Sequence, residues 1–206
     1  KTVKKLIFEN YKSHNFLNPP LANKEIIYNV HEKEYVDYIF DNIPDKGFSY
    51  FDPDTVACPN SLNSYLCAVG GSVEAVNQIN MNKNKKVFFC AHRPPGHHAE
   101  INKAMGFGVF NNVAISADYA LRSKKFKKIL IIDFDVHHGN GTQHIFENNP
   151  NIFYASSHQY PYYPGTGDLT EKGCGNIFNC PLPANCDSKL FRKLFSENIV
   201  DKINQN

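Results

Sequence analysis

An apolar stretch that ends in alternating charged residues is the feature that most constrains this fold. The stretch runs from Ile129 to Ile132, and Asp133, Asp135 and His137 follow at every second position before two glycines. In a β-strand, residues at i, i+2 and i+4 share one face, so the pattern predicts three side chains that point the same way at the end of a buried strand. Such groups are typical ligands of zinc, whereas buried carboxylates without partners are costly. The alternative is a solvated turn with incidental charges.

A second polar cluster lies upstream and contains two adjacent histidines. His97 and His98 follow two prolines and a glycine, in the loop after a predicted buried strand at 87–91. Ligands of open α/β sheets bind outside the carboxyl ends of the strands. A histidine can also take or donate a proton near neutral pH. The cluster therefore indicates proton-transfer chemistry, and the alternative is an exposed loop whose histidines have no function.

Strand and helix patterns alternate along the chain, which predicts a three-layer α/β/α fold with a mostly parallel sheet. We expect helices at 32–42, from Ser61 to Ile79, at 111–122, at 142–148 and after an N-cap at Asp187, with Leu190, Phe191, Leu194, Phe195 and Val200 on the buried side of the last. Strands are expected at 87–91, 129–134 and 152–156, and an irregular loop at 158–176. We interpret residues 1–206 as a single domain that is incomplete at its C-terminus, because such folds normally return to a further strand after a helix.

The composition argues against several classes of partner. The formal net charge of +2 gives no reason to expect nucleic-acid or membrane binding. No apolar run reaches the length of a membrane-spanning helix. The six cysteines contain no C-x-x-C pair, so we expect no zinc ribbon and predict reduced thiols in a cytoplasmic protein, or a nuclear one if the source is eukaryotic.

Four strings that occur in order identify a resemblance covering about residues 30 to 185. They are Arg93–Ala99 (RPPGHHA), Gly106–Asn112 (GFGVFNN), Asp133–Gln143 (DFDVHHGNGTQ) and Tyr163–Asp168 (YPGTGD). Together they resemble the zinc-dependent histone deacetylase family with its arginase-like fold. Asn140 and the following Thr142-Gln143 are similar to the class II branch and its bacterial deacetylase-like relatives.

The resemblance implies roles for both polar clusters. Asp135 and His137 match two zinc ligands. His98 matches the general base that activates water, and His97 matches its partner, which the carboxylate of Asp133 would orient.

The resemblance also implies a substrate tunnel and a cation site. Asn140 matches the group hydrogen-bonded to His98, and Phe107 and Tyr163 match the aromatic walls around an acetyl-lysine side chain, next to Gly106. Asp54 is the candidate gate for the substrate backbone, with Asp52 an equal alternative. A structural potassium ion would use the carbonyl oxygens of Asp133, Asp135, His137 and Ser157 and the hydroxyl of Ser156.

Two parts of the family pattern do not occur in the sequence. They are the Gly-Phe-Asp string with the third zinc ligand and the Gly-Gly-Tyr string with the oxyanion-stabilising tyrosine. Two protein ligands hold zinc poorly, and loss of an oxyanion donor costs about 10²–10³ in rate. We therefore expect a zinc-dependent deacetylase domain that acts on acetylated lysine in proteins. The alternatives are a non-catalytic acyl-lysine-binding module and an acetylpolyamine amidohydrolase; an arginase-like two-metal site is disfavoured, since it needs more carboxylates.

Overall fold

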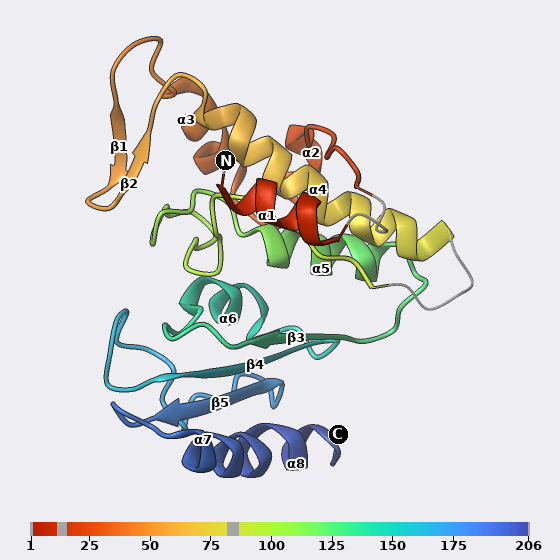
Figure 1. The fold of residues 1–206 in the computed structure, drawn as a ribbon, viewed down its shortest axis with the longest axis vertical. Coiled ribbons are helices and arrows are strands. Elements are labelled where there is room, and N and C mark those ends of the chain that lie inside the picture. Colours follow the sequence, from red (N-terminus) through yellow and green to blue (C-terminus); the bar gives the residue numbers. More distant parts are fainter. Residues whose placement is uncertain (1, 12–15, 82–86, 206) are drawn as a thin grey trace.

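A small parallel sheet lies between helices on both of its faces (Figure 1). The computed structural model describes residues 2–11, 16–81 and 87–205. The sheet has the order β3-β4-β5 and consists of β3 (Ile129–Asp133), β4 (Ile152–Gln159) and β5 (Ile177–Leu182), all parallel. A separate antiparallel hairpin is formed by β1 (Ser49–Asp52) and β2 (Thr55–Ala57). The predicted α/β/α fold with a parallel sheet is confirmed.

The helices divide between the two faces of the sheet. Helices α4 (Ser61–Met81) and α5 (Asn112–Arg122) pack together, and α5 contacts β3. Helix α7 (Ser188–Phe195) and a π-helical turn (Ser196–Val200), continued by α8 (Asp201–Ile203), cover β5 on the other side. The remaining helices are α1 (Thr2–Asn10), α2 (Lys24–Tyr28), α3 (Lys33–Asp41) and α6 (Asn140–Phe146). None of the helices in the described ranges is both long and apolar enough to span a bilayer.

Most expected elements form close to their predicted positions because their local signals agree with the packing. The apolar stripe of α4 is buried at Leu66, Val69 and Val73. Asn111 caps α5 by accepting a hydrogen bond from the amide of Ala114, and Asp187 caps α7 in the same way. Helix α6 begins two residues earlier than predicted, and β4 runs three residues further. His158 consequently lies in a strand and not in the predicted loop.

The buried side of the last helix agrees with the prediction in part. Phe191, Leu194 and Phe195 pack against the small core around Phe178 as expected. Leu190 and Val200 are exposed instead, and Ile199 is buried in that core. A π-helical turn adds one residue to the helical repeat. The apolar phase therefore shifts by one position after Phe195, which a regular 3.6-residue period does not anticipate.

The predicted buried strand at 87–91 is wrong. Val87 is 97% exposed and Phe89 is 82% exposed, and this part of the described chain pairs with no strand. The segment runs beside α4, where the thiol of Cys90 lies 3.8 Å from the carbonyl of Gly71. An apolar run becomes a strand only when a neighbouring strand accepts its backbone hydrogen bonds, and the residues alone do not supply that partner.

Candidate functional site

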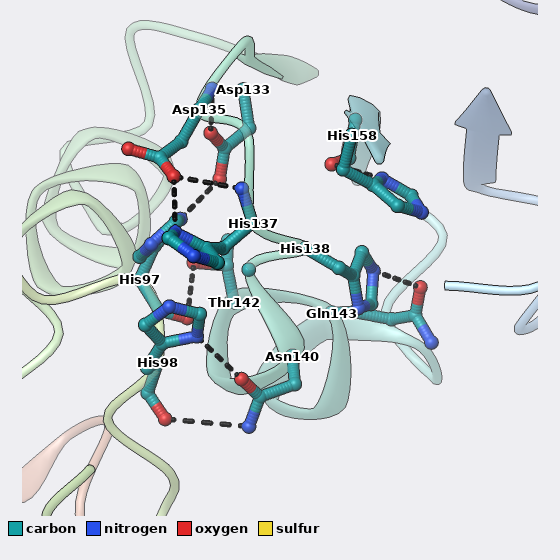
Figure 2. Close-up of polar contacts among 12 residues, drawn as sticks. His97, His98, Asp133, Asp135, His137, His138, Asn140, Thr142, Gln143 and His158 are labelled. Atoms are coloured by element: carbon teal, nitrogen blue, oxygen red, sulfur yellow. Dashed lines mark hydrogen bonds and ion pairs between the residues drawn. The ribbon is translucent and has the colours of Figure 1, made fainter. Parts of the chain in front are cut away.

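The loop after β3 brings the charged residues together by turns and not by a shared strand face. Strand β3 ends at Asp133. The amide of Asp135 donates to Asp133 Oδ1 (3.1 Å), and the amide of His137 donates to Asp135 Oδ1 (2.8 Å). These are two successive Asx-type turns. The predicted strand geometry of the three residues is therefore wrong, but the turns still place them side by side (Figure 2).

Asp133 and His97 form a buried ion pair that Tyr154 completes. His97 Nδ1 lies 2.8 Å from Asp133 Oδ2, and the hydroxyl of Tyr154 donates to the same oxygen at 3.0 Å. Burial alone would lower the pKa of His97, but the hydrogen bond to Asp133 and its charge outweigh burial and raise this pKa. The protonated form of His97 is thus favoured.

The pKa of His98 shifts in the opposite direction to that of His97. Burial, and then the charge of the neighbouring His97, lower the pKa of His98. Its Nδ1 lies 2.8 Å from Oδ1 of Asn140, and the two histidine rings are 4.0 Å apart. Because an amide oxygen only accepts, Nδ1 of His98 carries the proton and Nε2 is left with a lone pair. Adjacent histidines whose pKa values move apart suit paired acid and base roles.

Asp135 and His137 bring a carboxylate oxygen and a ring nitrogen close together. Asp135 Oδ1 lies 3.1 Å from His137 Nδ1. Two ligand atoms of a tetrahedral zinc, each about 2.0–2.1 Å from the ion, are roughly 3.3 Å apart. The two side chains therefore fit a zinc ion with little movement. Among the described residues, no group of three histidine, cysteine or acidic side chains forms a larger site.

Two tyrosines contact the histidine rings of the site, and the sequence analysis identified only one of them. The Tyr163 ring meets the rings of His98 and His137 edge-on, at 5.1 and 5.8 Å between centroids. Tyr162 stacks on His137 at 5.3 Å with an interplanar angle of 12°. An exposed aromatic pair within a Pro- and Tyr-rich loop gives no periodic signal, so the sequence pattern could not identify Tyr162.

The β1–β2 hairpin brings the candidate gate residues to the same region. Thr55 links the hairpin to the segment that carries Phe107. Its hydroxyl donates to Asp54 and accepts from the amide of Phe107, both at 3.2 Å. Burial raises the pKa of Tyr163, and the negative charges of Asp54 and Asp52 raise it further. The Phe107 side chain is 61% exposed. The gate role of Asp54 and the tunnel-wall role of Phe107 stay predictions.

Gly106 is required by close packing against His98. It has a positive φ of 57°, and a Cβ built there would lie 2.2 Å from Cδ2 of His98. A side chain at this position would displace the candidate base.

The expected potassium site lies partly in the sheet: Asp133, Ser156 and Ser157 belong to β3 and β4, whereas Asp135 and His137 follow in the loop after β3. Asp133 lies opposite Ser156 in the β3–β4 ladder. His158 Nε2 donates to the carbonyl of Gly167, so its Nδ1 accepts from the hydroxyl of Ser156 at 2.9 Å. The hydroxyl of Ser157 is buried and has no hydrogen-bond partner among the residues that the structure describes. Potassium binding here stays a prediction.

Gly141→Ala is expected to lower the free energy of unfolding by about 3 kcal/mol, as in other overpacked cores. A Cβ at Gly141 would lie 2.2 Å from the carbonyl oxygen of Ala99 and 2.8 Å from the carbonyl carbon of His98, and backbone atoms cannot move aside cheaply. Denaturant unfolding would measure the loss. Gly71→Ala in α4 is the control, because its nearest neighbour is a side-chain carbon of Pro19 at 3.2 Å. It should change stability by no more than about 1 kcal/mol, and equal losses would contradict the packing argument.

Comparison with known proteins agrees with this geometry. The model of the histone deacetylase domain matches residues 1–205. Histone deacetylase 14, chloroplastic, of Arabidopsis thaliana is 40% identical over 87% of this chain and 45% of its own length. A probable deacetylase of Archaeoglobus fulgidus is 36% identical over 92% of this chain and 53% of its own. The chain thus spans about half the length of these curated relatives.

A solved structure agrees as well. The crystal structure of the HDA15 HD domain has a TM-score of 0.74 and 39% identity over 80% of this chain and 48% of the solved chain. Fold, sequence and the family match over nearly the whole chain point the same way. This chain belongs to the histone deacetylase family.

Proposed function

We propose that this chain carries most of the site of a zinc-dependent deacetylase that hydrolyses N-acetyl amides, with acetyl-lysine in proteins as the favoured substrate. One observation carries the proposal. The pKa of His97 is raised and that of His98 is lowered, and both rings lie beside two atoms that could bind a metal ion, Asp135 Oδ1 and His137 Nδ1. The names of the relatives, histone deacetylase and probable deacetylase, support it.

The metal part of the proposal rests on two side chains. Asp135 Oδ1 and His137 Nδ1 would hold zinc. When bound, zinc supplies polarisation of the amide carbonyl and a lower pKa for water. Catalytic zinc sites usually have three protein ligands, so we expect the two described here to bind the ion weakly.

The histidines would divide the proton transfers. His98 is held with Nε2 unprotonated, so it can take the proton of the attacking water. The protonated form of His97, which the Asp133 carboxylate stabilises, would place positive charge next to the reacting group. Cleavage of the C–N bond returns one proton to the leaving nitrogen, and the products are acetate and a free amine.

Aromatic rings would hold the substrate stem. Tyr162 and Tyr163 lie over the His137 ring, where flat faces can bury a four-carbon chain and exclude water. Asp54, which is linked through Thr55 to Phe107, would accept a hydrogen bond from a substrate amide.

A non-catalytic acyl-lysine-binding module is the second candidate. The observation that favours it is that only two metal-ligand side chains come together in the described residues. An acetylpolyamine substrate is the third candidate, and the carboxylates of Asp52 and Asp54 near Tyr163 favour a cationic amine there.

His98→Ala is expected to reduce hydrolysis of an acetyl-lysine peptide by about 10²–10⁴ in the presence of zinc, the usual contribution of a general base. Zinc affinity, measured by titration calorimetry, should stay unchanged, whereas Asp135→Ala should abolish it. His92→Ala is the matched control, because His92 bonds to Ser72 outside the site.

The outcomes separate the candidates. Equal rates for His98→Ala and His92→Ala would refute the proposed base. Peptide binding without hydrolysis would favour the binding module, and faster hydrolysis of an acetylated polyamine than of the peptide would favour the third candidate.

A further inference from the structure

We propose that Glu100 is a positioning residue: its carboxylate fixes the amide orientation of Asn140, and this selects the tautomer of His98 that can act as a base. The inference rests on the proposed function for its catalytic meaning, but the positioning itself concerns only this chain's own side chains.

The amide nitrogen of Asn140 is surrounded by acceptors. Nδ2 lies 2.5 Å from Oε1 of Glu100, 3.4 Å from the carbonyl oxygen of His98 and 3.5 Å from Sδ of Met105. Asn140 itself is buried. The opposite orientation would place the amide oxygen against a carboxylate, which is strongly disfavoured. Glu100 is the charged member of this set, so it decides which way the amide faces.

The orientation of the amide determines where His98 carries its proton. As observed, Asn140 Oδ1 accepts from His98 Nδ1, and Nε2 is unprotonated. A reversed amide would donate to Nδ1, and the neutral ring would then have to carry its proton on Nε2. That tautomer cannot accept a proton from water at Nε2. A carboxylate that never contacts His98 therefore controls its competence as a base.

Helix α6 holds Glu100 from a second point. His144 lies four residues after Asn140, so the two side chains share a face of α6. Its Nδ1 donates to Oε2 of Glu100 at 2.6 Å. Each carboxylate oxygen thus has one donor from the same helix, and the side chain of Glu100 is mostly buried. Two bonds of this kind hold a carboxylate in one rotamer.

The test is the tautomer of His98 in the metal-free chain without substrate. Long-range proton–nitrogen correlation spectra distinguish protonated from unprotonated ring nitrogens, and His98→Gln identifies the His98 signals by their loss. In the unmodified protein we expect Nδ1 protonated. Glu100→Lys replaces the acceptor by a donor, so the amide should reverse and the tautomer ratio should move at least about tenfold towards Nε2–H.

Three variants make the result specific. Glu100→Gln still offers an oxygen to Asn140 and should keep the Nδ1–H form. The double variant Glu100→Lys with Asn140→Asp should restore it, because a carboxylate at 140 can accept from both the lysine and His98. Glu32→Lys is the control, since the Glu32 carboxylate also accepts from an asparagine amide, but from that of Asn102 and not from that of Asn140.

The inference is overturned if His98 keeps the Nδ1–H form in folded Glu100→Lys, or if Glu32→Lys produces the same change. Should the lysine variant not fold, Glu100→Leu replaces it and should give a mixture of tautomers; an unmixed Nδ1–H form would again overturn the inference. A chain that shows the predicted tautomers but no hydrolysis contradicts only the proposed function.

Discussion

Acidification from pH 7 to about pH 4.5 is expected to lower the free energy of unfolding by about 5 kcal/mol through His31 and His138. Burial lowers the pKa of each to about 4. His31 Nδ1 donates to the carbonyl of Glu100, and its Nε2 accepts from the amide of Asn111. Protonation would set an N–H against that amide, so the buried ring has to stay neutral.

Stability falls with decreasing pH because the unfolded chain binds protons more readily than the folded chain does. Between the ordinary histidine pKa of about 6.5 and the folded value of about 4, the unfolded chain binds more protons than the folded chain. The stabilisation by a neutral buried histidine is therefore nearly complete above about pH 6.5, and it is lost progressively as the pH falls from 6.5 to about 4. Denaturant midpoints at several pH values would measure this slope.

A variant isolates the contribution of one ring. His31→Gln removes one titrating group, and its stability should fall by roughly half as much over the same pH interval. An unchanged slope would contradict the assignment to His31.

Asp133→Ala is expected to cost about 3–5 kcal/mol, because it leaves one partner of a buried ion pair without its counter-charge. His97 loses the oxygen that raises its pKa, and the buried hydroxyl of Tyr154 loses its acceptor. Calorimetric unfolding at neutral pH would show a lower Tm, by roughly 2–4 °C for each kcal/mol.

Two control variants separate charge from hydrogen bonding and from general surface effects. Asp133→Asn retains an acceptor for His97 and should lose clearly less stability than Asp133→Ala. Asp118→Ala removes an i,i+4 pair whose partner, Arg122, is largely exposed, and helix pairs of this kind are worth only about 0.3–0.5 kcal/mol. Equal losses at positions 133 and 118 would show that burial of the ion pair is unimportant.

Local patterns were sufficient for the elements that carry their own signals. The stripe of α4, the cap at Asp187 and the apolar run of β3 each predict an element that the structure contains. The strand at 87–91 was wrong because strand formation depends on a partner elsewhere in the chain. The hairpin of β1 and β2 was missed, since strands of four and three residues are too short to give a pattern in the sequence.

The site was predictable where the chain keeps its groups close in sequence. Asp135 and His137 are two residues apart, and their donor atoms meet as expected. Contacts across long separations were not predictable. Glu100 lies 40 residues before Asn140, and Tyr154 lies 21 residues after Asp133. No periodicity relates such residues, because the meeting of α6, β4 and the histidine loop is decided by packing.

The residues of the site belong to two structural elements of different stability, the central sheet and the β1–β2 hairpin. Asp133 and Tyr154 belong to β3 and the central strand β4, which is paired on both sides. Asp54 belongs to a hairpin of two short strands, an arrangement that is only marginally stable by itself. Amide hydrogens of β4 should accordingly exchange only in global opening, and those of the hairpin in smaller local excursions. On gentle warming the hairpin with Asp54 should therefore lose its structure at a lower temperature than the sheet that carries Asp133 and Tyr154.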